Sequence, residues 1–198
     1  MGLTQFAPFW RDDARIVLHA SNESVGREPS RTLFAVINRP LFPVDAGELP
    51  AAVGVHEFEI GAAFAPEPGV NVHTFALSHQ GASAGIVVEH GGRKLCYVTD
   101  HEHGDAAADA RVIRAATGAD LLIYDATFSD AEMPEHRGWG HSSWEEGLRV
   151  KEKAGASLLA LAHHDPDRID AHLDRRAEAA AKKSANVFFA KQGMTVDL

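Results

Sequence analysis

The stretch LCYVTDHEHGDA, residues 95–106, joins an apolar run to a cluster of histidines and carboxylates. The apolar half, Leu95–Thr99, is typical of a buried β-strand, and polar side chains that follow such a strand commonly form a functional site. Taken alone, HEHGDA is one residue short of H-x-H-x-D-H, a spacing that forms two-metal sites in hydrolases. The rest of the sequence decides whether HEHGDA or its neighbours supply metal ligands.

Before this stretch, the sequence predicts mainly β-structure. Strands are expected at Arg15–His19, His56–Ile60, Val70–Leu77, Gly85–Glu89 and Leu95–Thr99. The paired glycines of EHGGRK, residues 89–94, predict a hairpin turn, because glycine adopts positive φ without steric cost. One helix is expected at Arg31–Asn38, with Ser30 as its N-cap and Pro40 beyond its end.

After Asp100, the pattern predicts alternating helices and strands. Helices are expected at Asp109–Thr117, Ser143–Ala154 and Asp170–Lys183, and strands at Leu121–Tyr124, Ser157–Ala162, Val187–Ala190 and Met194–Val196. Hairpins followed by β/α units predict a layered α/β (α+β) fold whose sheet is covered on at least one face. With 198 residues, 45% of them hydrophobic, the chain is expected to form a single domain over residues 1–198.

The charge and cysteine content limit the function classes. An excess of 28 acidic over 19 basic side chains, a net charge of −9, argues against a broad basic face that grips nucleic acid, although a few local cations could still hold such a substrate. The one cysteine, Cys96, rules out an intrachain disulfide and fits a reducing compartment. With neither a signal peptide nor a membrane span in the sequence, we expect a cytoplasmic protein without a membrane partner.

Metal-binding residue types follow four of the expected strands. They are His79, Asp100, Asp125 and the adjacent pair His163 and His164. Ligands gather at the carboxyl ends of strands in layered α/β folds, and histidine is the commonest metal ligand. The chain contains twelve histidines in all, which further favours a metal-dependent enzyme.

Four motifs give the chain a resemblance to a known family. They are ALSHQGASAGIVVEHGGRKLCYVTDHEH, LLIYDATF, GWGHSSWEEGLRV and LLALAHHDPDRID, residues 76–103, 121–128, 138–150 and 158–170. Their order and spacing resemble the second half of metallo-β-lactamase-fold hydrolases, in the branch that contains ribonuclease Z and related phosphodiesterases. The resemblance implies an αββα sandwich that carries two metal ions, usually zinc, at one edge of its sheets.

The resemblance also implies roles for individual residues. His79 and His163 match histidine metal ligands of the family, and Asp100 matches the aspartate that bridges the two ions. His141 of GHSS matches the histidine beside the scissile phosphate, and Asp125 takes the place of the acidic residue that orients this histidine and raises its basicity.

Each role has a simpler alternative. His164 is the alternative ligand to His163. His141 could simply belong to the cap of the following helix, with Ser142 and Ser143 making the hydrogen bonds. Trp139 and Trp144 fit either core packing or, with glycines nearby, a loop at the rim of a site. With Asp100 as the ligand, His101 and His103 become loop residues that support the site.

The sequence departs from the family at its defining motif, since H-x-H-x-D-H is absent. The opening MGLTQFAPFW resembles the residues that follow this motif in the family, so an N-terminally truncated fold is expected. His79, Asp100 and His163 could then hold one Zn²⁺ ion or share two, with Mn²⁺ as the alternative metal, and a competent two-metal site is in doubt.

The implied activity is hydrolysis by a metal-activated water. The expected substrate is a phosphodiester or another small molecule, with RNA also open; a lactone or thioester is not dismissed, and a homodimer is left open. The competing hypothesis is a fragment or pseudoenzyme without catalysis, because the main metal motif is missing.

Overall fold

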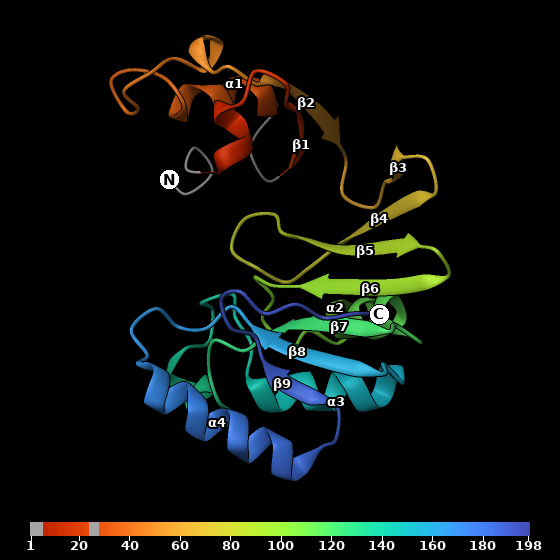
Figure 1. The fold of residues 1–198 in the computed structure, drawn as a ribbon. Coiled ribbons are helices and arrows are strands. Elements are labelled where there is room, and N and C mark those ends of the chain that lie inside the picture. The colour runs from red at the N-terminus through yellow and green to blue at the C-terminus, as the bar shows by residue number, and fades with distance from the viewer. Residues whose placement is uncertain (1–5, 24–27) are drawn as a thin grey trace. The chain divides into compact units, whose positions relative to one another are not determined.

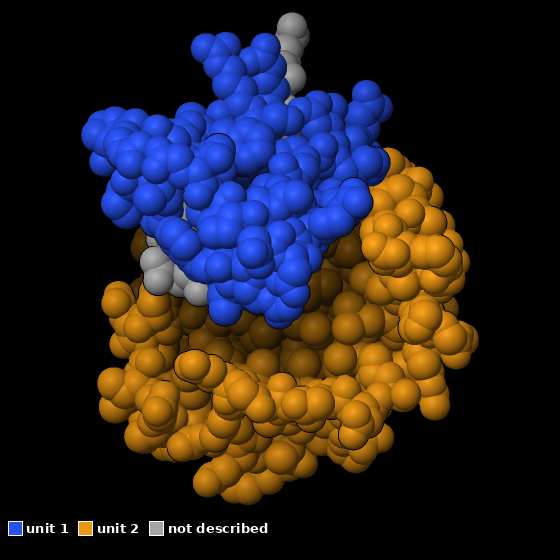
Figure 2. Space-filling view, turned by 45° about the horizontal axis from the view of Figure 1, so that its top comes forward, with its two compact units in different colours: residues 1–60 blue, residues 61–198 orange. Residues whose placement is uncertain are grey.

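The computed structural model describes residues 6–23 and 28–198. The chain divides into two compact units, Met1–Ile60 and Gly61–Leu198, which Figure 2 colours blue and orange. The single domain expected over residues 1–198 stays a prediction. The first five residues of MGLTQFAPFW lie outside the described residues.

The first unit contains a short parallel sheet of two strands, β1 (Arg15–Ser21) and β2 (Ala52–Phe58) (Figure 1). Helix α1 (Pro29–Val36) and the 3-10 turns η2 (Ala7–Trp10) and η3 (Ala46–Glu48) complete it. Its buried core consists of Phe9, Ile37, Phe42 and Leu49, against which Ile16 and Leu18 of β1 pack. The alternation of these two side chains is the period that a half-buried strand requires.

The second unit is built on one seven-stranded sheet with the order β3-β4-β5-β6-β7-β8-β9 (Figure 1). The strands are β3 (Ala63–Glu67), β4 (Val70–Ala76), β5 (Ala84–His90), β6 (Arg93–Val98), β7 (Leu121–Asp125), β8 (Leu158–Ala162) and β9 (Val187–Phe189). The pairs from β3 to β6 are antiparallel, and those from β6 to β9 are parallel. Helices α2 (Ala106–Ala116), α3 (Trp144–Ala154) and α4 (Asp170–Lys183) and the 3-10 turn η4 (Met133–Glu135) complete this unit. The layered mixed α/β class is thereby confirmed.

Apolar side chains of the parallel strands and the helices form the core of the second unit. Leu122, Tyr124, Leu159 and Leu161 of the strands are fully buried, and Val112 of α2 joins them. Cys96 is also fully buried, as expected, and burial raises the pKa of its thiol to about 12. Its thiol is therefore protonated and inert at neutral pH.

Several element boundaries differ from prediction for identifiable reasons. Helix α2 begins at Ala106 rather than Asp109, because the Asp105 carboxylate caps it by accepting the N–H groups of Ala107 and Ala108. Helix α1 begins at Pro29 rather than after Ser30, since proline suits the first turn and the Ser30 hydroxyl donates to Glu57 instead.

The strands differ from prediction in two places. Strand β3 was not predicted; it contains Pro66, and the register of this edge strand shifts between Phe64 and Glu67, which accommodates the proline. The strand expected at Met194–Val196 does not form, because the chain turns at Gly193 (φ 79°) and leaves Met194 exposed.

The sheet topology brings the predicted polar residues to one edge. Strands β4, β6, β7 and β8 run in the same direction, so their carboxyl ends lie at the same edge of the sheet. His79 follows β4, Asp100 follows β6, Asp125 ends β7 and His163 directly follows β8. In the part of the chain that the structure describes, no helix is both long and apolar enough to span a bilayer.

Two of these residues have an unusual backbone conformation. Asp100 (φ 56°) and His163 (φ 58°) lie in the left-handed region, where among described non-glycine residues only Asn186 joins them. A side chain other than glycine costs about 1–2 kcal/mol in this region. Backbone strain of this kind is concentrated at functional sites.

We expect the strain at His163 to be measurable in the metal-free protein. His163→Gly should be more stable than His163→Ala by about 1 kcal/mol, because both variants lose the imidazole but only glycine relieves the positive φ. The exposed helical residue Glu178 provides the control, where alanine should be favoured over glycine by about 1 kcal/mol. Urea denaturation measures both pairs, and a preference for alanine at both positions would contradict strain at His163.

Candidate metal centre

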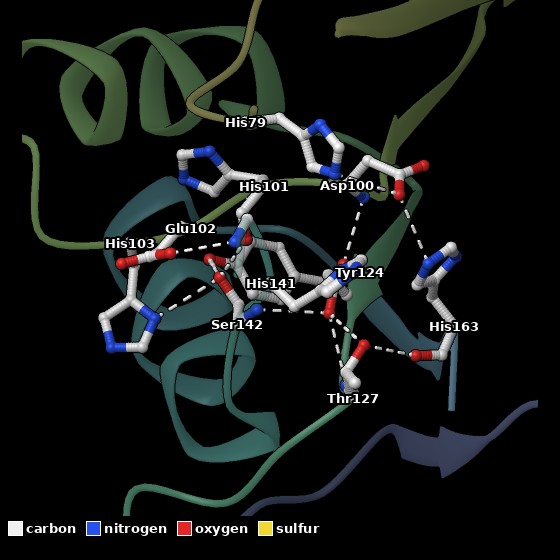
Figure 3. A network of polar contacts seen from close by, with 12 residues as sticks. His79, Asp100, His101, Glu102, His103, Tyr124, Thr127, His141, Ser142 and His163 are labelled. Atoms are coloured by element: carbon white, nitrogen blue, oxygen red, sulfur yellow. Dashed lines mark hydrogen bonds and ion pairs between the residues drawn. The ribbon is translucent and has the colours of Figure 1, made fainter. Parts of the chain in front are cut away.

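The structure brings His79, Asp100, Asp125, His141 and His163 together at the edge of the seven-stranded sheet (Figure 3). Four of them come from the strand ends described above. His141 comes from the loop that precedes α3, and its ring centroid lies 5.6 Å from that of His79 and 5.0 Å from that of His163. The predicted set is therefore one spatial cluster, although its residues span more than 80 positions of sequence.

Asp100 lies between the two histidines that were predicted as metal ligands. Its Oδ1 atom is 3.6 Å from His79 Nε2 and 3.3 Å from His163 Nε2. Two ligand atoms bound to the same tetrahedral zinc ion lie about 3.4 Å apart, because each bond is about 2.0–2.1 Å long. Each histidine is thus spaced to share a cation with Asp100.

The donor atoms of the cluster form two overlapping groups. Within one group, atoms of His79, Asp100 and His141 all lie within 4.8 Å of one another; within the other, those of Asp125, His141 and His163 do. His79 and His163 fall in different groups, so the donors do not surround a single point. His141 belongs to both groups, whereas Asp100 belongs only to the first and Asp125 only to the second.

The tautomer of His79 supports a role as a ligand. Its Nδ1 lies 2.7 Å from the carbonyl oxygen of Gln80, which can only accept, so Nδ1 carries the hydrogen. In the neutral ring, Nε2 then presents a lone pair toward the Asp100 carboxylate, an unfavourable pairing that a cation would relieve. A backbone carbonyl on the distal nitrogen is also the usual support of a metal-bound histidine.

The Asp125 carboxylate is fully buried and accepts hydrogen bonds from several loop residues. Its Oδ2 accepts the N–H of Asp100 at 3.0 Å, and its Oδ1 accepts the N–H groups of Thr127 and Ser142, each at 3.2 Å. The Thr127 hydroxyl lies 2.9 Å from Oδ1 and 2.7 Å from the carbonyl oxygen of His163. Asp125 is thus tied to the loops that carry Asp100, His141 and His163.

His141 is oriented by this carboxylate. Its Nδ1 lies 3.0 Å from Asp125 Oδ2, and this hydrogen bond raises the pKa of the imidazole above its ordinary value despite partial burial. His141 does not cap α3, because the Ser143 hydroxyl fills that role by accepting the N–H of Glu146. The hydrogen bond of the cap thus comes from Ser143, while His141 is held by Asp125.

The two adjacent histidines after β8 differ in environment. His163 faces Asp100 (Figure 3), whereas the ring of His164 stacks on Phe189 with centroids 5.1 Å apart. His164 Nε2 lies 3.3 Å from the carbonyl oxygen of Ala190. The structure thus places His163, and not His164, in the cluster.

Glu102 supports the site but was not predicted to do so. Its carboxylate accepts the N–H of Gly138 at 2.8 Å and that of Gly140 at 2.9 Å, which fixes the loop that leads to His141. Burial disfavours the charged form, but these hydrogen bonds outweigh it and lower the pKa of Glu102. Gly140 (φ 84°) allows this approach, since a Cβ there would lie 2.4 Å from His79 Cδ2. The two glycines around Trp139 were the sequence signal for this tight loop.

The histidines of HEHGDA support the loops without joining the cluster. His101 is fully buried; its Nδ1 accepts the N–H of Ser78 at 3.2 Å, and its Nε2 lies 3.3 Å from Asp109. Burial lowers the pKa of His101. His103 Nδ1 lies 3.3 Å from the Ser142 hydroxyl. His101 thereby connects the loop before His79 to α2, in keeping with the supporting role expected for this loop residue.

Comparisons with known proteins agree with this geometry. Residues 11–164 match the family described as the beta-lactamase superfamily domain. The ribonuclease Z of Halobacterium salinarum is 34% identical over 107 residues, which are 54% of this chain and 33% of that protein. The match therefore spans about a third of this curated relative.

Solved structures show the same fold. The metallo-beta-lactamase fold protein YhfI from Bacillus subtilis superposes with a TM-score of 0.64 at 18% identity, over 90% of this chain and 64% of that one. The Zn(2+)-bound PqqB from Methylobacterium extorquens superposes with a TM-score of 0.62 at 19% identity, over 92% and 64%. With a family match over more than half of its residues, this chain belongs to the beta-lactamase superfamily domain family and has the metallo-beta-lactamase fold.

Proposed function

We propose that this protein is a metal-dependent hydrolase of phosphodiesters whose centre is formed by His79, Asp100 and His163. The observation that carries this proposal is the position of Asp100 Oδ1 between two imidazole nitrogens, at 3.6 and 3.3 Å. The strained backbone of Asp100 and His163 adds support, because the fold maintains it at these two residues.

The donor set favours zinc. Imidazole nitrogen and carboxylate oxygen are both common zinc ligands, and Mn²⁺ is the alternative because it also accepts carboxylate oxygen. His79 and His163 would each bind through Nε2, and Asp100 would be shared. We propose one or two ions per chain; each position needs further ligands from water, substrate or residues outside this set.

The side chains around the centre suit proton transfer. A bound zinc ion would supply a Lewis acid and would lower the pKa of a coordinated water toward neutrality. Asp125 holds the Nδ1 proton of His141 and so fixes the ring. The raised pKa of His141 favours its protonated form, which can donate a proton from Nε2 to the leaving oxygen as a general acid.

The phosphodiester assignment draws on relatives named ribonuclease Z. RNA is therefore one candidate substrate, and a small phosphodiester is the other. The net charge of −9 favours the smaller substrate, because extended RNA is normally bound by a basic face. We also propose a cytoplasmic location, in keeping with the lone buried thiol.

The alternative function is metal or ligand binding without turnover. The 198 residues contain no H-x-H-x-D-H motif, which is the observation that favours this alternative. Zinc binding together with hydrolysis of bis(p-nitrophenyl) phosphate would exclude it. Absence of both zinc and hydrolysis, with zinc or manganese supplied, would refute the enzyme.

The two histidines after β8 provide a matched test of the ligands. His163→Ala should weaken zinc binding by at least about tenfold, since removal of a ligand leaves Asp100 with one fewer partner. His164→Ala should leave zinc affinity within about twofold, and Asp100→Asn should weaken it as His163→Ala does. Competition with a chromophoric chelator measures all three. Loss of zinc in His164→Ala with retention in His163→Ala would reverse the assignment.

Substitution of His141 separates catalysis from metal binding. His141→Gln should lower kcat for bis(p-nitrophenyl) phosphate by about 10²- to 10⁴-fold, the usual contribution of general acid catalysis. Zinc affinity should stay close to that of the unsubstituted protein, because glutamine removes the acid and leaves His79, Asp100 and His163 in place. Steady-state kinetics and the same chelator competition measure these effects. A parallel loss of zinc would make His141 a ligand instead.

A further inference from the structure

We propose that Trp139 is a stacking platform for the nucleobase of a small nucleotide phosphodiester that binds at the candidate metal centre. The inference rests on the proposed function, which concerns the phosphate, and adds recognition of the group attached to it. The carrying observation is an exposed tryptophan on a firmly held loop, two residues before His141.

Trp139 is exposed in a way that packing does not explain. Its relative exposure is 59%, whereas Trp144, five residues later at the start of α3, is 5% exposed and belongs to the core. A large aromatic surface left in water beside a polar site is typical of ligand contact, because planar rings gain from stacking on one another.

The loop beneath Trp139 is held on both sides. Glu102 accepts the N–H groups of Gly138 and Gly140, and the Gln80 side-chain amide donates to the carbonyl oxygen of Gly138. The backbone N–H of Trp139 donates to the carbonyl oxygen of His136 at 3.1 Å. A platform fixed in this way loses little conformational entropy when a ligand binds.

Neighbouring rings connect Trp139 to the centre. Its ring meets those of His136 and Phe128 edge to face, with centroids 4.9 and 6.2 Å away. The ring centroid of Phe128 also lies 6.3 Å from that of His141. A base stacked on Trp139 would therefore place its attached phosphate on the side of the chain of rings that leads to His141 and the metal ligands.

The surrounding charges favour a small ligand over a long RNA. Arg137, two residues before Trp139, lies 3.8 Å from the Glu102 carboxylate and donates to the carbonyl oxygen of His103. Arg149 pairs with Asp130 and Glu146 near the start of α3. Arg168 and Arg176 both pair with Glu132. Because these guanidinium groups already have carboxylate partners, they offer little to a string of phosphates, whereas one phosphate at the metal and one stacked base need none of them.

The experiment uses fluorine NMR of the zinc-supplemented chain labelled with 5-fluorotryptophan. The three tryptophans give separate signals, and Trp139→Phe identifies that of Trp139. The methyl ester of adenosine 5′-phosphate should shift the Trp139 signal, and dimethyl phosphate, which lacks the base, should not. An unshifted Trp139 signal at saturating adenosine ester would overturn the inference.

Affinities give a second measurement. Trp139→Leu should weaken binding of the adenosine ester by about 5- to 150-fold, the fold-change that corresponds to stacking of one base. Trp139→Phe should keep most of the affinity, and Trp10→Leu, which removes a 48% exposed tryptophan from the first unit, should have no effect. Equal affinity in Trp139→Leu and the unsubstituted chain would refute the platform.

A third arm separates a nucleotide from RNA. A ten-residue oligoadenylate should bind no more than about threefold tighter than the adenosine ester if one base is recognised. Binding at least ten times tighter would overturn the small-nucleotide assignment in favour of an RNA chain. A Trp139 signal that responds to the ester in a chain that neither binds zinc nor cleaves diesters would support the platform and refute the proposed hydrolase.

Discussion

The buried carboxylate of Asp125 is the interaction on which the candidate centre depends. A charge without solvent is costly unless hydrogen bonds replace the lost water, and Asp125 receives them from Asp100, Thr127, Ser142 and His141. Asp100 follows β6, whereas Thr127, His141 and Ser142 all lie between β7 and α3. The need to satisfy one buried charge therefore fixes the relative positions of segments that the sheet alone would leave adjustable.

The residues of the centre fall into two sets, those that face the site and those that hold the backbone behind it. Asp100, His141 and His163 face the site, where a cation or substrate can reach them. Asp125, Glu102 and His101 lie behind them and hold backbone amides: Asp125 that of Asp100, Glu102 those of the glycine loop, and His101 that of Ser78. The exposed residues are consequently oriented before any ligand arrives, which reduces the reorganisation that binding requires.

The sequence predicted the strand ends better than the supports behind them. Apolar runs followed by His79, Asp100, Asp125 and His163 are local patterns, and parallel topology turns them into one edge. The support from Glu102 depends on glycine amides that lie 36 and 38 residues away, a pairing that no local pattern contains. Likewise, strand β3 contains a proline, a residue that is unfavourable in most strands. The position of β3 at the edge of the sheet accommodates this proline, and that position is a property of the tertiary structure.

The left-handed backbone at Asp100 and His163 also constrains how this centre could be lost during evolution. Asparagine and glycine are the residues best suited to that conformation, and a single base change converts either an aspartate or a histidine codon into an asparagine codon. A descendant that no longer needed its metal would gain backbone stability by that route. Asparagine at both positions would then be expected where the site no longer binds a metal, whereas this chain carries aspartate and histidine there.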